Sequence, residues 1–180
     1  MTVPLSSDRI ILRSWNPDSE TEAAFEIYGD PEVMQWIGDG KTVDDIETLR
    51  ERIQQRNQQC LDLNDGTGFW AIVEQKTGYP IGTVILKRLP DGDGQLTGEW
   101  EVGWHLRKAS WGKGYATEAA RAIVDYGFMG LKLPCIYAIA YPANRPSIRV
   151  MERLGMAELG LTNQYYGRDN LVLYQATPPV

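Results

Sequence analysis

Hydrophobic and polar residues follow two periods along this chain, one typical of strands and one typical of helices. Short segments rich in alternating or β-branched and aromatic residues predict strands over 9–13, 69–74, 81–87, 97–107, 136–141, 165–166 and 171–175. Apolar residues at helical spacing predict helices over 22–28, about 43–61, 116–127 and 147–154. The two kinds of element alternate, which indicates a mixed α/β fold.

Turn and cap residues divide these elements. Gly29-Asp30-Pro31 is expected to stop the first helix, and Thr42 precedes an acidic helix start in a cap-like pattern. Residues 76–78 predict a hairpin, and residues 167–170 predict a hairpin turn between strands 165–166 and 171–175. Without an internal repeat or a linker, residues 1–180 are expected to form a single domain.

Composition narrows the class of protein. The chain has 180 residues and a formal net charge of −6, which argues against nucleic-acid binding and is compatible with a cationic amine partner. Neither a membrane span nor a signal peptide is expected. Cys60 and Cys135 are too few for a disulfide framework, which favours reduced thiols and a cytoplasmic location. One histidine and two distant cysteines predict no metal site.

The most informative segment follows a predicted strand and begins a predicted helix. Gly112 and Gly114 allow close approach of a ligand, and Lys113 adds positive charge between them. The helix that follows contributes unpaired N–H groups, so the segment is a candidate cradle for a pyrophosphate. It matches neither the P-loop nor the dinucleotide fingerprint, since Lys113 is followed by glycine and Thr117 replaces the third glycine. An ordinary strand–helix turn is the alternative.

Four blocks of the sequence carry a resemblance to a known family. They are Ser7-Asp8-Arg9-Ile10-Ile11-Leu12-Arg13, Glu101-Val102-Gly103-Trp104-His105-Leu106, Trp111-Gly112-Lys113-Gly114-Tyr115-Ala116-Thr117-Glu118-Ala119, and residues 144–156 with an Asn-x-x-Ser start and a Leu-Gly-hydrophobic end. In this order they resemble the GNAT superfamily of acetyl-coenzyme A-dependent N-acetyltransferases. Within it they are similar to the branch of ribosomal-protein N-terminal acetyltransferases (RimJ/RimL type). The resemblance implies an α+β fold with a mixed, mostly antiparallel central sheet flanked by helices.

The resemblance also assigns residues that would bind acetyl-coenzyme A. Backbone groups where the fourth family strand splays from its neighbour hold the pantetheine arm, and Asn144 would hydrogen-bond the same arm. The pyrophosphate would rest on the loop that follows. The implied backbone and loop residues are Trp104, His105, Leu106, Trp111, Gly112, Lys113, Gly114, Tyr115 and Ala116. The family's usual Arg or Gln three residues before the first cradle glycine is replaced here by Ala109, for which Arg107 or Lys108 would compensate.

Acetyl transfer to an amine needs a base, because a free amine is largely protonated near pH 7. Alternation places Glu99, Glu101, Gly103 and His105 on one strand face. The resemblance favours Glu101 as the base, whereas Glu99 is interpreted as a solvated carboxylate. His105 is left out of the catalytic set, because a lone strand histidine is more often structural.

Protonation of the leaving thiolate points to a second residue. Many superfamily members have a tyrosine general acid where this chain has Met151, whose thioether cannot donate a proton. In the branch that this sequence resembles, the general acid would instead be Ser147, with water as the alternative proton donor. Asn144 and Ser147 could instead simply cap a helix.

The acceptor remains open at this stage. A primary amine, either a protein N-terminus or a small molecule, would attack directly in a ternary complex. Trp15, Trp36, Trp70, Tyr165 and Tyr166 are candidate lining residues, with Trp36 and Tyr165 preferred. Two alternatives are a non-catalytic acyl-coenzyme A sensor and a nucleotide-phosphate binder. The protein is expected to be a monomer or homodimer.

Overall fold

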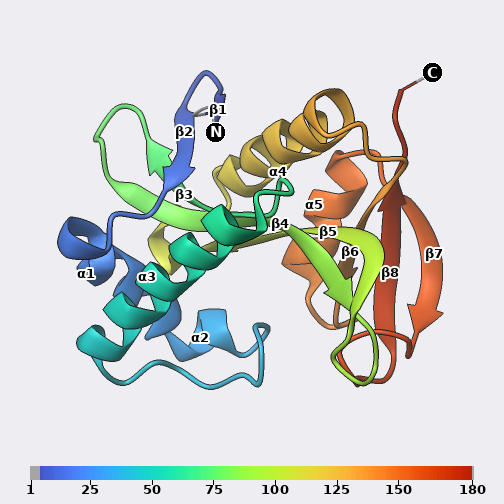
Figure 1. Ribbon diagram of the computed structural model, residues 1–180, viewed down its shortest axis with the longest axis horizontal. Helices are drawn as coiled ribbons and strands as arrows, with labels where there is room; N and C mark the ends of the chain where they lie inside the picture. The colour runs from blue at the N-terminus through green and yellow to red at the C-terminus, as the bar shows by residue number, and fades with distance from the viewer. Residues whose placement is uncertain (1–4, 180) are drawn as a thin grey trace.

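The computed structural model describes residues 5–179, and these residues form one eight-stranded sheet with helices on both faces (Figure 1). The strand order is β1-β2-β3-β4-β5-β6-β8-β7. Every neighbouring pair is antiparallel except β5–β6, which is parallel. The strands are β1 (Leu5–Ser6), β2 (Ile10–Ser14), β3 (Gly68–Glu74), β4 (Pro80–Pro90), β5 (Leu96–Leu106), β6 (Ile136–Ala140), β7 (Ala157–Thr162) and β8 (Leu171–Ala176). This is the mixed, mostly antiparallel sheet that was predicted.

All the α-helices except α4 begin after a residue whose side chain can satisfy a free N–H group. The helices are α1 (Pro17–Tyr28), α2 (Pro31–Met34), α3 (Ile46–Leu63), α4 (Tyr115–Asp125) and α5 (Arg145–Arg153). Asn16, Asp30, Asp45 and Asn144 cap four of them through their side-chain oxygens. A 3₁₀ turn at Lys108–Ser110 precedes α4, and a π-helical turn at Tyr126–Gly130 follows it. No helix within residues 5–179 is both long and apolar enough to cross a membrane.

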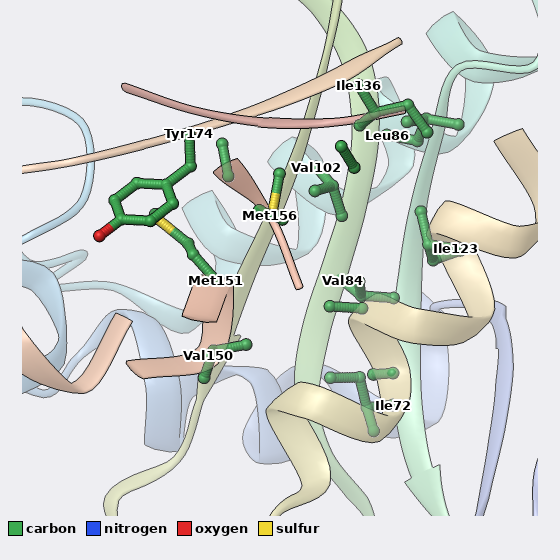
Figure 2. Packing of buried hydrophobic residues seen from close by; sticks show 14 of the residues in the cluster. Ile72, Val84, Leu86, Val102, Ile123, Ile136, Val150, Met151, Met156 and Tyr174 are labelled. Carbon is green, nitrogen blue, oxygen red and sulfur yellow. The ribbon is translucent and has the colours of Figure 1, made fainter. Parts of the chain in front are cut away.

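Side chains from alternate strand positions build a hydrophobic core under α4. Ile72, Val84 and Val102 extend from β3, β4 and β5, and in Figure 2 they lie beside Ile123 of α4. Met151 of α5 continues this core toward Tyr174 of β8 (Figure 2). Since burying such side chains is the main favourable term in folding, this face fixes α4 and the turn that precedes it.

The opposite sheet face is covered only in part. Helix α1 packs on β4 and helix α3 on β3, and a second core that includes Ile27, Leu49, Ile53 and Val73 joins them on the other side of the sheet from the gold helix α4 (Figure 1). Further along, the face presents polar or small residues, because Glu101 and His105 of β5 take the alternate positions to Val102 and Trp104. The polar side chains of β5 therefore line a space on this face of the sheet, next to α3.

The sheet divides between β5 and β6. These two strands share a single register pair, Glu101 with Tyr137, whereas β4 and β5 pair over most of their length. Beyond Glu101 the edge of β5 that faces β6 has no strand partner among the described residues. Peptide groups on this edge are consequently free to bind something other than a strand.

Several predicted elements and boundaries were wrong. Helix α1 begins at Pro17, before the predicted 22. The cap of α3 is Asp45 rather than Thr42, since Asp45 Oδ2 accepts from Thr48 N at 2.7 Å. Helix α5 begins at Arg145, before the predicted 147. Residues 165–166 are no strand, because Tyr165 makes only an isolated bridge to Asp91 and Tyr166 has a φ of +62°. β8 lies between β6 and β7 and pairs antiparallel with both, so its partner on the outer side is β7, Ala157–Thr162.

Candidate active site

A cavity of about 420 Å³ lies between the β4–β5 face, the segment from α2 to α3, and the splay of β5 from β6. We call it the central cavity. It brings together side chains from segments far apart in the sequence. Those used below are Trp36, Lys41, Arg52, Arg56, Lys87, Glu101, Trp104, His105, Tyr141, Asn144, Ser147, Met151, Tyr166 and Arg168.

Glu101 is a buried carboxylate in this cavity and is 7% exposed. Its Oε2 atom accepts a hydrogen bond from the Tyr166 hydroxyl and lies 3.6 Å from Lys87 Nζ. The Lys87 ammonium also lies 4.9 Å from the centre of the Tyr166 ring. Burial raises the pKa of Glu101 above its ordinary value, and Lys87 and the Tyr166 hydroxyl oppose that rise. The carboxylate is thus a stronger base than an exposed one.

His105 lies on the same strand face as Glu101, four residues further along β5, with Gly103 midway between them. Its ring meets Tyr28 edge to face, with centroids 6.1 Å apart. Nδ1 is buried and has no hydrogen-bond partner among the described residues. Burial, with Arg56 and Lys87 nearby, lowers the pKa of His105 to about 3. The imidazole is therefore neutral at any physiological pH.

Arg168 forms hydrogen bonds to two different segments at one rim of the central cavity. Its Nη1 donates to the Tyr141 hydroxyl at 2.6 Å, and its Nη2 donates to the carbonyl of Gly38. The rings of Trp36 and Tyr141 also meet across this rim, with centroids 6.4 Å apart. The loop after α2 is therefore attached to the end of β6 and to the β7–β8 connection.

Peptide groups of β5 alternate between β4 and the splay. Arg107 N donates to Ile81 O at 3.1 Å, toward β4. Because successive residues in an antiparallel ladder direct their peptide groups to opposite sides, those of Trp104 and Leu106 face the splay, while that of His105 faces β4. The Leu106 carbonyl already accepts from Trp111 Nε1 at 2.9 Å. Trp104 therefore offers the free peptide group nearest the cavity.

The cradle, residues 111–116, has the backbone shape that was predicted. Gly112 and Gly114 have φ angles of +74° and +84°, which other residues adopt only with strain. Helix α4 has no side-chain cap at Gly114, so its first N–H groups remain available at the positive end of the helix dipole. Lys113 is exposed and makes no ion pair within residues 5–179. These features fit a pyrophosphate.

The outer side of the cradle is held by contacts of Arg9 and Glu74, to which the sequence analysis assigned no role at this site. Arg9 Nη1 donates to the carbonyl of Lys113 at 3.0 Å, and Arg9 Nε donates to Glu118 at 2.7 Å. The Arg9 guanidinium also lies 4.7 Å from the centre of the Tyr115 ring. Tyr115 in turn donates its hydroxyl to Glu74. Strands β2 and β3 thereby fix the turn from outside.

The two cations expected to compensate for Ala109 are engaged elsewhere. Arg107 Nη1 lies 3.0 Å from Glu26 of α1, and Lys108 pairs with Glu32 of α2. Both side chains bind acidic residues of helices on the opposite sheet face from α4. Among the described residues, the two cationic side chains that do lie at the cradle are those of Lys113 and Arg9.

Asn144 and Ser147 lie where the end of α5 meets the central cavity. Asn144 Oδ1 accepts from Ser147 N at 3.3 Å, so this side chain does cap the helix. Asn144 is buried and also lines the central cavity. Ser147 is half-buried and lines the same cavity as Glu101. Met151 also lines it and is almost fully buried.

The predicted aromatic residues divide between the two faces of the sheet. Trp15 and Trp36 line the central cavity, whereas Trp70 belongs to the core under α4. Tyr166 lines the cavity in place of Tyr165, which is buried. Strand alternation could not distinguish the two tyrosines, because Tyr165 makes only an isolated bridge and Tyr166 has a left-handed φ of +62°.

The sheet divided between two parallel strands, with an uncapped, glycine-rich helix start beside the division, agrees with the fold that the resemblance implied. A family model described as an acetyltransferase (GNAT) domain matches residues 9–157. The chain therefore belongs to the GNAT acetyltransferase family and is an N-acetyltransferase. Members of this family use acetyl-coenzyme A.

Individual relatives agree with this assignment. The uncharacterized N-acetyltransferase p20 of Bacillus licheniformis is 30% identical over 161 residues, which cover 89% of this chain and 86% of that protein. The GNAT-family acetyltransferase from Bacillus anthracis has a TM-score of 0.78 at 25% identity, covering 97% of this chain and 98% of that one. RimL, a ribosomal L7/L12 α-N-protein acetyltransferase solved with coenzyme A, shares the fold with a TM-score of 0.76 at 15% identity, over 95% of each chain.

Proposed function

We propose that this protein transfers the acetyl group of acetyl-coenzyme A to a primary amine, by direct attack of the amine within a ternary complex. One observation carries the proposal: Glu101, a buried carboxylate, lines the same cavity as Trp104, Asn144 and Ser147 at the β5–β6 splay. A base and the groups that would hold the thioester thus share one space. We propose further that residues 1–180 act as a single acetyltransferase domain.

Glu101 is assigned the role of general base. An ammonium ion cannot attack a carbonyl, so the amine must lose a proton to a group whose pKa is closer to neutrality than that of a solvated carboxylate. Burial raises the pKa of Glu101 in that direction. Lys87 and the Tyr166 hydroxyl oppose that rise in pKa, because both stabilise the charged form of the carboxylate. Transfer is direct or through one water.

Binding of acetyl-coenzyme A is assigned to backbone groups. The peptide group of Trp104 would polarise the thioester carbonyl, and Asn144 would donate to the pantetheine arm. The N–H groups of residues 112–116, together with the Lys113 charge, would hold the pyrophosphate, whereas the Trp111 N–H donates to the carbonyl of Lys108 at 3.1 Å. When bound, the coenzyme supplies an activated thioester. The peptide group of His105 faces β4 and not the splay, so we assign the binding of the thioester carbonyl to the peptide group of Trp104 instead.

Ser147 is assigned to protonate the leaving thiolate, with water as the alternative donor. Its hydroxyl lies on the first turn of α5, at the cavity surface. No acyl-enzyme is required: neither Cys60 nor Cys135 lines the central cavity, and burial raises the pKa of Cys60, which favours its unreactive thiol form. A monomer or homodimer in the cytoplasm, acting on a protein N-terminus or a small amine, is the proposed setting.

Calorimetric titration with acetyl-coenzyme A, followed by measurement of free thiol release with pooled amines and peptides, tests the proposal. We expect saturable binding and thiol release that depends on the amine. Binding without release from any amine in the pool would overturn the proposed acceptor chemistry. An absence of binding would overturn the assignment of the cradle and the splay.

A further inference from the structure

The central cavity carries more positive than negative charge, although the whole chain has a net charge of −6. Five cationic side chains line it against two carboxylates. Lys41 lies 3.6 Å from Asp39, and Lys87 lies 3.6 Å from Glu101. Arg168 donates to uncharged oxygens. Each carboxylate of the cavity is thus already paired, and a surplus of positive charge remains.

The surplus is concentrated on α3. Arg52 and Arg56 are four residues apart, which places them on one side of the helix, and both line the central cavity. Neither makes an ion pair with a carboxylate in the part of the chain that the structure describes. Arg56 stacks on Phe69, with its guanidinium carbon 4.2 Å from the ring centre. Stacking orients the guanidinium and leaves its N–H groups free at the edge.

His105 gives an independent indication that the cavity accepts a polar ligand. Its Nδ1 atom is buried and has no hydrogen-bond partner within residues 5–179, which costs free energy unless something binds there. The cations Arg56 and Lys87 help to lower the pKa of His105, after burial itself. The electrostatic potential that opposes a positive imidazole favours an anion in the same place.

We propose that the acceptor carries a carboxylate in addition to its amine, with the carboxylate bound by Arg52 and Arg56 while the amine lies at Glu101. This inference rests on the proposed function and names its substrate class. The paired positions on α3 can donate several charged hydrogen bonds to one carboxylate. The same positive potential also favours the neutral form of the bound amine, the form that attacks.

Matched acceptors test the substrate class. The small pair is 5-aminopentanoate and 5-aminopentanamide, which share the amine and the chain length and differ in one charge. The peptide pair is Ala-Asp-Ala-amide and Ala-Asn-Ala-amide, in which the N-terminal amine is the same. We expect kcat/KM for the carboxylate member of at least one pair to exceed that of its amide by about tenfold or more, the scale of a charged hydrogen bond. The pair that shows it identifies the source of the carboxylate.

Substitutions on α3 test whether Arg52 and Arg56 are the residues that bind the carboxylate of the acceptor. The double variant Arg52→Gln/Arg56→Gln should reduce the carboxylate preference to within about twofold of unity, with the KM for acetyl-coenzyme A unchanged. The matched control is Arg50→Gln, which removes the same charge from the same helix at a residue that pairs with Glu47 at 3.7 Å and does not line the cavity. It should keep the full preference. The single variants Arg52→Gln and Arg56→Gln replace the double variant if that one does not fold.

The outcomes separate this inference from the proposed function. Equal kcat/KM for the carboxylate and amide members of both pairs, with turnover present, would overturn the inference alone. Preference that survives loss of both arginines would overturn the assigned site. If no amine is acetylated, the proposed function fails, and calorimetric binding of 5-aminopentanoate to the protein saturated with coenzyme A still tests the inference. Binding that is lost in the double variant and kept in Arg50→Gln would support it, and no binding would overturn it.

Discussion

The coenzyme side and the acceptor side of this site are built in different ways. The coenzyme side consists mainly of backbone groups from one stretch of the chain, the end of β5 and the cradle at 111–116. The acceptor side consists of side chains from the loop after α2, from α3, β4 and β5, and from the β7–β8 connection. Both sides meet at Glu101, where β5 parts from β6.

This difference decides how each side responds to sequence change. A backbone site needs particular conformations, so it constrains glycines and helix starts and tolerates many side chains around them. A side-chain site depends on which residues tertiary packing brings together, so its chemistry can change while the fold is kept. Substitutions on the coenzyme side should alter the KM for acetyl-coenzyme A, and those on the acceptor side should alter acceptor use or kcat.

The largest effect is expected at the point where the two sides meet. Glu101→Gln removes the base and keeps the size of the side chain, so kcat at neutral pH should fall by about 10²-fold or more, the usual contribution of a general base. The loss should be largest between the pKa of Glu101, which burial raises, and the pKa of the acceptor amine. Above the amine pKa the loss should shrink, because the neutral amine no longer needs the base. Steady-state rates across pH measure this.

Glu99→Gln is the matched control for that variant. Glu99 lies on the same strand face but outside the central cavity, where it accepts the Tyr165 hydroxyl at 2.6 Å. Its rate should stay within about twofold of the wild-type rate. A Glu101→Gln protein with wild-type kcat at every pH would remove Glu101 from the mechanism.

A smaller effect, confined to the coenzyme, is expected at Gly114. Ala in a left-handed conformation costs about 1–2 kcal/mol, so Gly114→Ala should distort the cradle and raise the KM for acetyl-coenzyme A by about tenfold. The acceptor KM should not change. Gly94→Ala has a similar φ of +81° in a distant turn with open space around it, and it should lose comparable stability without any change in either KM. Equal effects of the two substitutions on the coenzyme KM would refute the cradle.

The predictable part of the site was the part encoded by local patterns. Period-two alternation correctly placed Glu101 and His105 on one face of β5. Gly112 and Gly114 marked the positive φ angles of the turn before α4. In each case the physical cause acts over a few residues, so a single sequence carries the signal.

The remainder depended on contacts between distant segments. Arg9 reaches the carbonyl of Lys113 from a position 104 residues away in the chain. Arg107 was expected near the cradle because it is close in sequence, but Glu26 of α1 binds it instead. No local pattern reports such pairings, since each is decided by how the helices pack on the sheet. Tyr166 was weighed below Tyr165 for the same reason.

The two adjacent tyrosines give the smallest and most specific prediction. The Tyr166 hydroxyl donates to the Glu101 carboxylate, and this hydrogen bond lowers the pKa of Glu101. Tyr166→Phe removes the bond, so the pKa of Glu101 should rise and the acid limb of the kcat–pH profile should move to higher pH. At neutral pH and above, the change in kcat should be about threefold or less. The profile is measured with one acceptor for all proteins, so that the amine's own titration cancels.

Tyr165→Phe completes the comparison. It also removes a single hydroxyl bonded to a carboxylate, but that carboxylate is Glu99, outside the central cavity. Its acid limb should coincide with that of the wild type. An equal displacement in both variants would mean that the limb reports general loosening of the β7–β8 connection. A displacement in Tyr166→Phe alone would place the titrating group at Glu101, on the side of the site that packing, and not local sequence, assembles.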